Sequence, residues 1–272
     1  MEKITVGLQL YTVRDFLEKD FMGTLDKVAE MGYEAVELCG LYGHTAKEVK
    51  AKCAMLGLDP ISAHVTLDNM QKDGVIASYA EIGCRYVVIP WCDSKTDFVG
   101  ADGYENFKNV IKKAAEECKK HDITLLYHNH DFEFVKVDGE YKLDIFYNEL
   151  SAEVLKTEID TCWAKVGGAD PVQYVLKYTG RAPVVHLKDY VGGKSANMYE
   201  LIGGGKVHEN ETKSAPFELR PVGYGCQDVE GIIKAAKQAG AAAVIVEQDL
   251  PSMGKTSLEC AQMSIKHIKS LF

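Results

Sequence analysis

The sequence predicts an α/β protein whose residues 1–272 form a single (β/α)8 TIM barrel. Two observations predict this class. Eight short runs of β-prone residues alternate with helix-like stretches, and about 250 residues is the usual size of such a barrel. Three segments (29–40, 80–91 and 237–249) also repeat one pattern, in which a helix-like stretch ends at a glycine before a new apolar run. Glycine is the usual left-handed cap of a helix.

The predicted strands account for each apolar run in turn. They cover residues 4–11, 34–39, 60–65, 86–91, 123–128, 155–160, 182–187 and 242–247. Between them, residues 104–121 show the clearest helical spacing of apolar side chains. A doubly wound open sheet is the alternative, but no G-x-G-x-x-G motif follows the first run.

The connection over residues 190–227 breaks the regular alternation. It contains "GGK", "GGGK" and "RPVGYG" and shows little helical periodicity. Long connections of this kind are often functional. Since this one follows the seventh predicted strand, we expect it to lie over the barrel mouth and shield a substrate.

Composition narrows the classes of function. The chain is 46% hydrophobic and 26% charged, as in soluble globular proteins, and its net charge of −9 disfavours nucleic-acid binding. The longest apolar run, residues 239–246, is far shorter than the roughly 20 residues of a membrane span. The N-terminus lacks a signal-peptide pattern, so the cytoplasm is the expected location. The eight cysteines form no C-x-x-C pair and are expected to be reduced.

Polar residues end the predicted strands, where barrels of this class place their active sites. Strand side chains alternate between faces, so His128 and His130 share a face, and so do Glu158 and Asp160. Imidazole and carboxylate groups gathered at one mouth suit a divalent metal such as Mn, Mg, Zn or Co. The strand-end residues are Gln9, Tyr11, Glu37, His64, Trp91, His128, His130, Glu158, Asp160, His186, Lys188, Glu247 and Asp249.

Structural readings compete at several of these positions. A lone histidine such as His64 is more often a hydrogen-bonded loop residue than a ligand. Trp91 and Trp163 either cap the barrel core or form walls of a sugar pocket. Glu158 and Lys188 either take part in catalysis or form a buried ion pair between two strands.

The motifs resemble those of the xylose-isomerase-like barrels. "GLQLYTVR", "AVELCG", "HNHDFEF", "EIDTCW", "VVHLKDY" and "VIVEQD" occur in the expected order, from residue 4 to about residue 268. This superfamily includes sugar isomerases and epimerases, inosose dehydratases and apurinic endonucleases. Members with the "HNHDFEF" motif are usually called sugar phosphate isomerase/epimerase.

The resemblance implies one divalent metal, held in the epimerase-like members by a Glu, an Asp, a His and a Glu. The last three positions fall on Asp160, His186 and Glu247. The first falls on His128, where many relatives have a glutamate that is also one of two proton-transfer bases. Its replacement disfavours a two-base epimerase, and Trp163 stands where many members have a second histidine.

The sequence thus predicts a metal-dependent isomerase or epimerase that acts on a sugar, keto-sugar or cyclitol by removing a proton next to a carbonyl. Its metal ligands would be His128, Asp160, His186 and Glu247. The catalytic residues would be Glu247 as base, His130 (or His128) as its partner, Lys188 to stabilise negative oxygen, and Glu158. Substrate would contact Gln9, Tyr11, Glu37, His64, Trp91 and Trp163.

Other functions remain compatible with the same residues. A keto-sugar lyase or dehydratase shares the first proton abstraction. An apurinic endonuclease would need more metal ligands and a basic face, and a sugar-binding barrel without catalysis would lack the metal. Asp131 and Glu133 would orient the two imidazoles, with Glu133 a further candidate ligand. A homo-oligomer is compatible with the sequence.

Overall fold

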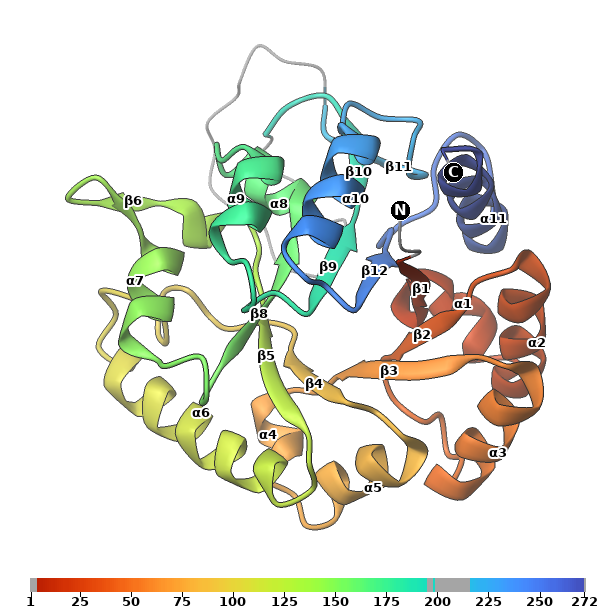
Figure 1. The fold of residues 1–272 in the computed structure, drawn as a ribbon, viewed down its shortest axis with the longest axis horizontal. Helices are drawn as coiled ribbons and strands as arrows, with labels where there is room; N and C mark the ends of the chain where they lie inside the picture. Colours follow the sequence, from red (N-terminus) through yellow and green to blue (C-terminus); the bar gives the residue numbers. More distant parts are fainter. Residues whose placement is uncertain (1–3, 195–197, 199–215, 272) are drawn as a thin grey trace.

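The barrel is closed, with eight parallel strands in the order β1-β12-β9-β8-β5-β4-β3-β2 (Figure 1). The computed structural model describes residues 4–194, 198 and 216–271. The strands are β1 Thr5–Gln9, β2 Ala35–Leu38, β3 Asp59–His64, β4 Tyr86–Ile89, β5 Thr124–His128, β8 Lys156–Asp160, β9 Val184–Leu187 and β12 Ala243–Val246. All eight predicted strands are confirmed, and the open-sheet alternative is wrong.

Helices surround the barrel on its outside (Figure 1). They are α1 Arg14–Leu17, α2 Phe21–Met31, α3 Ala46–Leu56, α4 Leu67–Met70, α5 Val75–Ile82, α6 Tyr104–Lys119, α7 Lys142–Glu149, α8 Thr161–Val166, α9 Pro171–Lys177, α10 Val229–Gln238 and α11 Ser257–Ser270, with 3-10 turns η1 Leu10–Val13 and η2 Phe132–Phe134. The helix expected at 104–121 is α6. Gly32 and Gly83 cap α2 and α5 with φ of 89° and 116°, as their repeated pattern predicts.

Two short antiparallel pairs lie outside the barrel sheet. One joins β6 (Lys136–Val137) to β7 (Glu140–Tyr141), and the other joins β10 (Asp189–Val191) to β11 (Glu218–Arg220). The second pair gives the long connection ordered ends that its lack of periodicity did not predict. Residues 195–197 and 199–215 lie outside the described residues, so the shielding role predicted for this connection stays a prediction.

The barrel interior is filled with apolar side chains below the strand ends. Strand alternation places Ala243 and Ile245 of β12 in this inner cluster, while Val244 and Val246 pack against the helices. Space inside is tight, because a Cβ added at Gly7 would lie 2.5 Å from Cδ1 of Ile245. The cluster comprises Ala35, Ile61, Val88, Leu126, Val184, Ala243 and Ile245. It forms a solid floor beneath the mouth.

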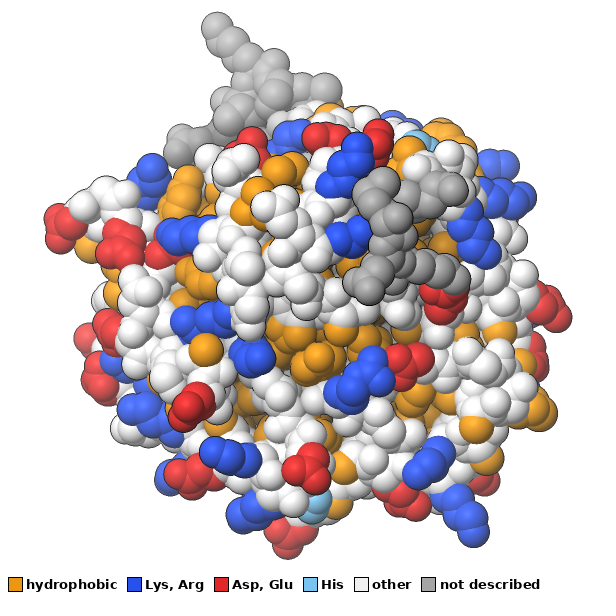
Figure 2. Space-filling model, in the orientation of Figure 1, with side chains coloured by type: hydrophobic (Ala, Val, Ile, Leu, Met, Phe, Trp, Pro, Cys, Tyr) orange, Lys and Arg blue, Asp and Glu red, His pale blue; other side chains and the backbone are white. Residues whose placement is uncertain are grey.

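The charges on the surface, the helices and the state of the cysteines agree with what the composition predicts. Figure 2 shows lysine and arginine interspersed with aspartate and glutamate over one face. Within the described ranges, no helix has both the length and the apolar character needed to span a bilayer. All eight cysteines are free thiols, as their spacing predicts.

Candidate metal centre and active site

The site stands directly on the apolar floor. Because alternate residues of a strand face the same way, the next inward-facing residue after each floor residue lies two positions along its strand. Ala35 is followed in this way by Glu37, Leu126 by His128, Val184 by His186 and Ile245 by Glu247. The barrel therefore changes from apolar to ionisable within one layer of side chains.

Four side chains at the mouth form a group that could hold a cation, which we call the four-ligand group. It consists of His128, Asp160, His186 and Glu247, all buried, with one candidate ligand atom from each lying within 4.8 Å of the others. Nδ1 of His186 lies 3.1 Å from Oε2 of Glu247, and Nε2 of His128 lies 4.0 Å from Oδ2 of Asp160. Two imidazoles and two carboxylates are a suitable donor set for a divalent metal.

Asp160 is held so that one of its oxygens remains available. It ends β8 and caps α8, and its Oδ1 accepts a hydrogen bond of 2.8 Å from the Trp163 backbone N–H. The Asn129 side chain bonds both the N–H and the C=O of Asp160 and fixes its backbone. Among the described residues, the buried Oδ2 accepts no hydrogen bond, and Nζ of Lys188 lies 3.4 Å from it. Such an oxygen next to two imidazoles fits a metal ion.

Glu37 and Glu158 form a buried carboxylate pair behind the histidines. Oε1 of Glu37 lies 2.8 Å from Nε2 of His186 and 3.1 Å from Nε2 of His64. Oε2 of Glu158 lies 2.7 Å from Nε2 of His64 and 3.0 Å from Nδ1 of His128. Gln9 donates a hydrogen bond of 2.7 Å to Oε1 of Glu37. Neither carboxylate is exposed.

Lys188 stands among three carboxylates on the other side of the site. Its Nζ lies 2.8 Å from Glu247, 2.9 Å from Asp249 and 3.4 Å from Asp160. The alternative in which Lys188 pairs with Glu158 is wrong, because Glu158 faces the histidines instead. Burial opposes the lysine charge, but the three carboxylates outweigh it and hold the pKa of Lys188 well above its usual value.

The surroundings set the charge states of the other groups. Burial opposes ionisation of Glu247, but Lys188 and His186 outweigh it and hold the pKa of Glu247 well below its usual range. Burial and nearby positive groups lower the pKa of His128 well below 6.5, and that of His130 to about 3. Burial raises the pKa of Asp160 to about 6 against the effect of Lys188. His186 differs from these two histidines: burial opposes its charge, but Glu158 and Glu37 outweigh it and hold the pKa of His186 well above 6.5. At neutral pH the metal-free mouth thus offers neutral His128 and His130, a cationic His186 and the ionised Glu247.

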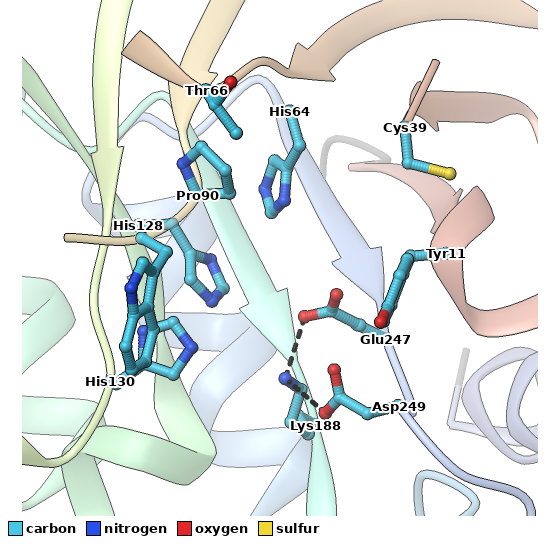
Figure 3. A pocket seen from close by; sticks show the side chains of 11 residues that line it. Tyr11, Cys39, His64, Thr66, Pro90, His128, His130, Lys188, Glu247 and Asp249 are labelled. Atoms are coloured by element: carbon cyan, nitrogen blue, oxygen red, sulfur yellow. Dashed lines mark ion pairs between the residues drawn. The ribbon is translucent and has the colours of Figure 1, made fainter. Parts of the chain in front are cut away.

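A cavity of about 510 Å³ opens above these groups, a size suited to a small-molecule ligand. Figure 3 shows His128 and His130 on one side, with Glu247, Asp249 and Lys188 facing them across the space. The lining residues are Tyr11, Cys39, His64, Thr66, Pro90, Trp91, His128, His130, Lys188, Glu247 and Asp249.

The predicted substrate contacts separate into two sets. Tyr11, His64 and Trp91 line the cavity, and Trp91 is 46% exposed with its ring edge-on to His130 and Phe132. Gln9, Glu37 and Trp163 are fully buried and are not among the lining residues described. The ring of Trp163 stacks on Phe217 with centroids 5.5 Å apart. We therefore propose supporting roles for these three.

Three lining residues were missed as site candidates, and Asp249, which is one of the predicted strand-end residues, had been given no role. Cys39 and Pro90 directly follow the ends of β2 and β4, Thr66 lies two residues beyond the end of β3, and Asp249 lies two residues beyond Glu247. The signal that could have found them is their position, since loops after barrel strands carry the site. The residue types of Cys39, Thr66 and Pro90 alone carried no such signal.

The acids that follow "HNH" hold the backbone of that segment. Glu133 accepts hydrogen bonds from Tyr127 Oη at 2.7 Å and from the His130 backbone N–H at 2.8 Å. Asp131 pairs with Lys194 at 2.5 Å. Both differ from the expected contacts with imidazole rings, because the chain turns into η2 from Phe132 onward and the two acids contact other groups there.

Glu133 provides a prediction of pH-dependent stability. Burial raises the pKa of Glu133 from 4.5 to about 8, so between these values the unfolded chain loses a proton that the folded metal-free protein keeps. Stability therefore falls as pH rises through this window. We expect Glu133→Gln to remove part of the decrease in melting temperature between pH 5 and pH 8.

Thermal denaturation of both proteins at the two pH values measures this effect. Glu81→Gln, at an exposed position of α5, is the matched control and should keep the wild-type pH dependence. An identical pH dependence in Glu133→Gln and wild type would contradict the prediction.

Fold and site together define a (β/α)8 barrel with a histidine–carboxylate centre at its C-terminal mouth. The family model of the xylose isomerase-like TIM barrel matches residues 25–271. The chain belongs to this family.

Three proteins that resemble this chain are each 26% identical to it or less. Inosose dehydratase of Geobacillus kaustophilus (strain HTA426) is 26% identical over 188 residues, which are 61% of this chain and 60% of that protein. A sugar phosphate isomerase/epimerase of Parabacteroides distasonis ATCC 8503 superposes with a TM-score of 0.77 at 22% identity, covering 99% of this chain and 95% of the other. The IOLI protein with a bound zinc atom superposes with a TM-score of 0.70 at 14% identity, covering 98% of each chain.

Proposed function

We propose that this protein is a divalent-metal-dependent enzyme that isomerises or epimerises a sugar, keto-sugar or cyclitol by removing a proton next to its carbonyl. The observation that carries the proposal is the four-ligand group, two of whose members, His128 and Glu247, line a cavity of small-molecule size. The family and the sugar-related names of the relatives support the substrate class.

The cation would be held by His128, Asp160, His186 and Glu247. When bound, a divalent ion such as Mn, Mg, Zn or Co acts as a Lewis acid that stabilises negative charge on substrate oxygens. The zinc atom bound by the IOLI protein supports a metal in this family of barrels.

Residues of the chain itself divide the remaining tasks. Glu247 is held ionised at the cavity wall and takes the proton from the substrate carbon. His130 is neutral and lies on the opposite side of the cavity. There it transfers a proton to or from the substrate position next to the carbon that Glu247 deprotonates. Lys188 is a buried cation facing the same space and stabilises negative oxygen. The rings of Tyr11 and Trp91 present apolar faces to the carbon skeleton.

A keto-sugar dehydratase or lyase is the second candidate. Elimination needs one base and one acid, and His128 stands where the epimerase-like relatives have a second carboxylate base. Burial opposes the charge of His64, but Glu37 and Glu158 outweigh it and raise its pKa to about 10, so a cationic imidazole lines the cavity and could protonate a leaving hydroxyl. The inosose dehydratase relative favours the same reaction.

Exchange of carbon-bound protons tests the shared first step. The metal-stripped protein is incubated with Mn²⁺, Mg²⁺, Zn²⁺ or Co²⁺ and a panel of keto-sugars and cyclitols in deuterated water. We expect deuterium to enter one substrate next to its carbonyl only when metal is present. The product then separates the candidates, because isomerisation conserves the formula whereas dehydration loses water.

The metal-free protein with each substrate is the control for spontaneous exchange. A folded protein that binds none of the four ions would contradict the proposal. So would a metal-loaded protein that exchanges no proton across the panel.

A further inference from the structure

Two histidines of the four-ligand group each face carboxylates with both ring nitrogens. His128 directs Nδ1 to Glu158 at 3.0 Å and Nε2 toward Asp160 at 4.0 Å. His186 directs Nε2 to Glu37 at 2.8 Å and Nδ1 to Glu247 at 3.1 Å. In each ring, one nitrogen thus faces the buried carboxylate pair and the other faces the four-ligand group.

The chemistry of imidazole assigns these nitrogens. A neutral ring has one N–H and one lone pair, and a carboxylate can only accept a hydrogen bond. A cation requires the lone pair. If the N–H of each ring points to the buried pair, both lone pairs point toward the same space between Asp160 and Glu247.

We propose that Glu37 and Glu158 are positioning residues that fix the tautomers of His186 and His128, so that His186 carries its proton on Nε2 and His128 on Nδ1. This inference rests on the proposed function, since it assumes a cation in the four-ligand group. Carboxylates that accept the second N–H of ligating histidines set ring orientation and increase ligand basicity in other metal sites.

One oxygen of each acid is held by neighbouring side chains. Nε2 of His64 lies within 3.1 Å of a carboxylate oxygen of each acid, and Gln9 donates a further hydrogen bond to Glu37. Both acids are fully buried, so solvent is not in position to replace them as acceptors. They therefore act on the metal through the histidine rings, without contact with substrate.

An ion placed lower in the barrel is the competing arrangement. His64, His128, Glu158 and His186 also bring ligand atoms within 4.8 Å of one another. This set shares both histidines with the four-ligand group, so filling both places would require each ring to lose its second proton. We therefore expect one ion per chain.

The test measures Zn²⁺ affinity and stoichiometry of wild type, Glu37→Gln and Glu158→Gln by competition with a chromogenic chelator. Glutamine keeps the size of the side chain and removes the charge. We expect one Zn²⁺ per wild-type chain and a roughly 10- to 100-fold weaker affinity in each variant. Asp144→Asn is the matched control, a buried carboxylate bonded to Tyr174 and Tyr178 away from the site, and should bind Zn²⁺ as the wild type does.

Long-range ¹H–¹⁵N spectra of the histidines in zinc-loaded wild type give a second readout that needs no variant. We expect Nδ1–H for His128 and Nε2–H for His186. The opposite tautomers, two ions per wild-type chain, or unchanged affinity in folded variants would each overturn the inference while leaving the proposed function in place. A wild type that binds no ion would overturn the proposed function too.

Discussion

Replacing Glu247 by glutamine is expected to lower the rate of metal-dependent proton exchange by about 10²- to 10⁴-fold, the usual contribution of a general base. The amide has nearly the same shape but cannot accept the substrate proton. The surrounding cations hold Glu247 ionised in the wild type, so this charge is available at neutral pH. Single-turnover exchange in deuterated water, with the bound metal quantified in each sample, measures the effect.

Ligation and proton transfer are separated by adding metal. If glutamine only weakened metal binding, saturating metal would restore the wild-type rate, and the assignment of Glu247 as base would be contradicted. We expect the loss to persist at saturation. Glu81→Gln, on the exposed face of α5, should retain the wild-type rate.

Lys188→Met is expected to reduce the free energy of unfolding of the metal-free protein by about 3–5 kcal/mol, the usual cost of removing one partner from a buried ion pair. Lys188 is 2% exposed and lies within 3.4 Å of three carboxylates. Because its pKa is raised above the unfolded value, its stabilising contribution is fully present at pH 7. Denaturant unfolding at pH 7 measures the loss.

Two comparisons make this result specific. Lys234→Met removes an exposed ion pair with Glu230 and should change stability little. The loss in Lys188→Met should shrink as pH falls, because the remaining carboxylates can then take up protons. A loss of stability no larger than that of Lys234→Met would show that the three carboxylates do not depend on the lysine.

The strands and the identity of the mouth could be predicted because each apolar run ends in a polar residue. Alternation also correctly places Glu158 and Asp160 on one face. The depth of each side chain in the barrel could not be predicted in the same way. The two residues are separated by about 6.6 Å along a strand, which is enough to put Glu158 behind the histidines and Asp160 next to Lys188.

The sequence also could not predict which charged side chains on neighbouring strands pair with each other. Lys188 and Glu158 lie on strands that are adjacent in the barrel, which made their pairing plausible. The register instead aligns Asp160 with His186, and Lys188, two residues further along, contacts the carboxylates of the β12 end. Similarly, the antiparallel pairing of β10 with β11 joins two segments of three residues, too short for an alternating pattern to predict.

The apolar floor of the barrel limits the route by which small molecules can enter and leave the site. Its seven side chains fill the space below the site, so the cavity is a pocket with a closed end, and substrate must arrive and product must leave on the same side. A bound product therefore prevents substrate from binding, and a bound substrate prevents product from binding. Product inhibition should accordingly be competitive with substrate in the steady state.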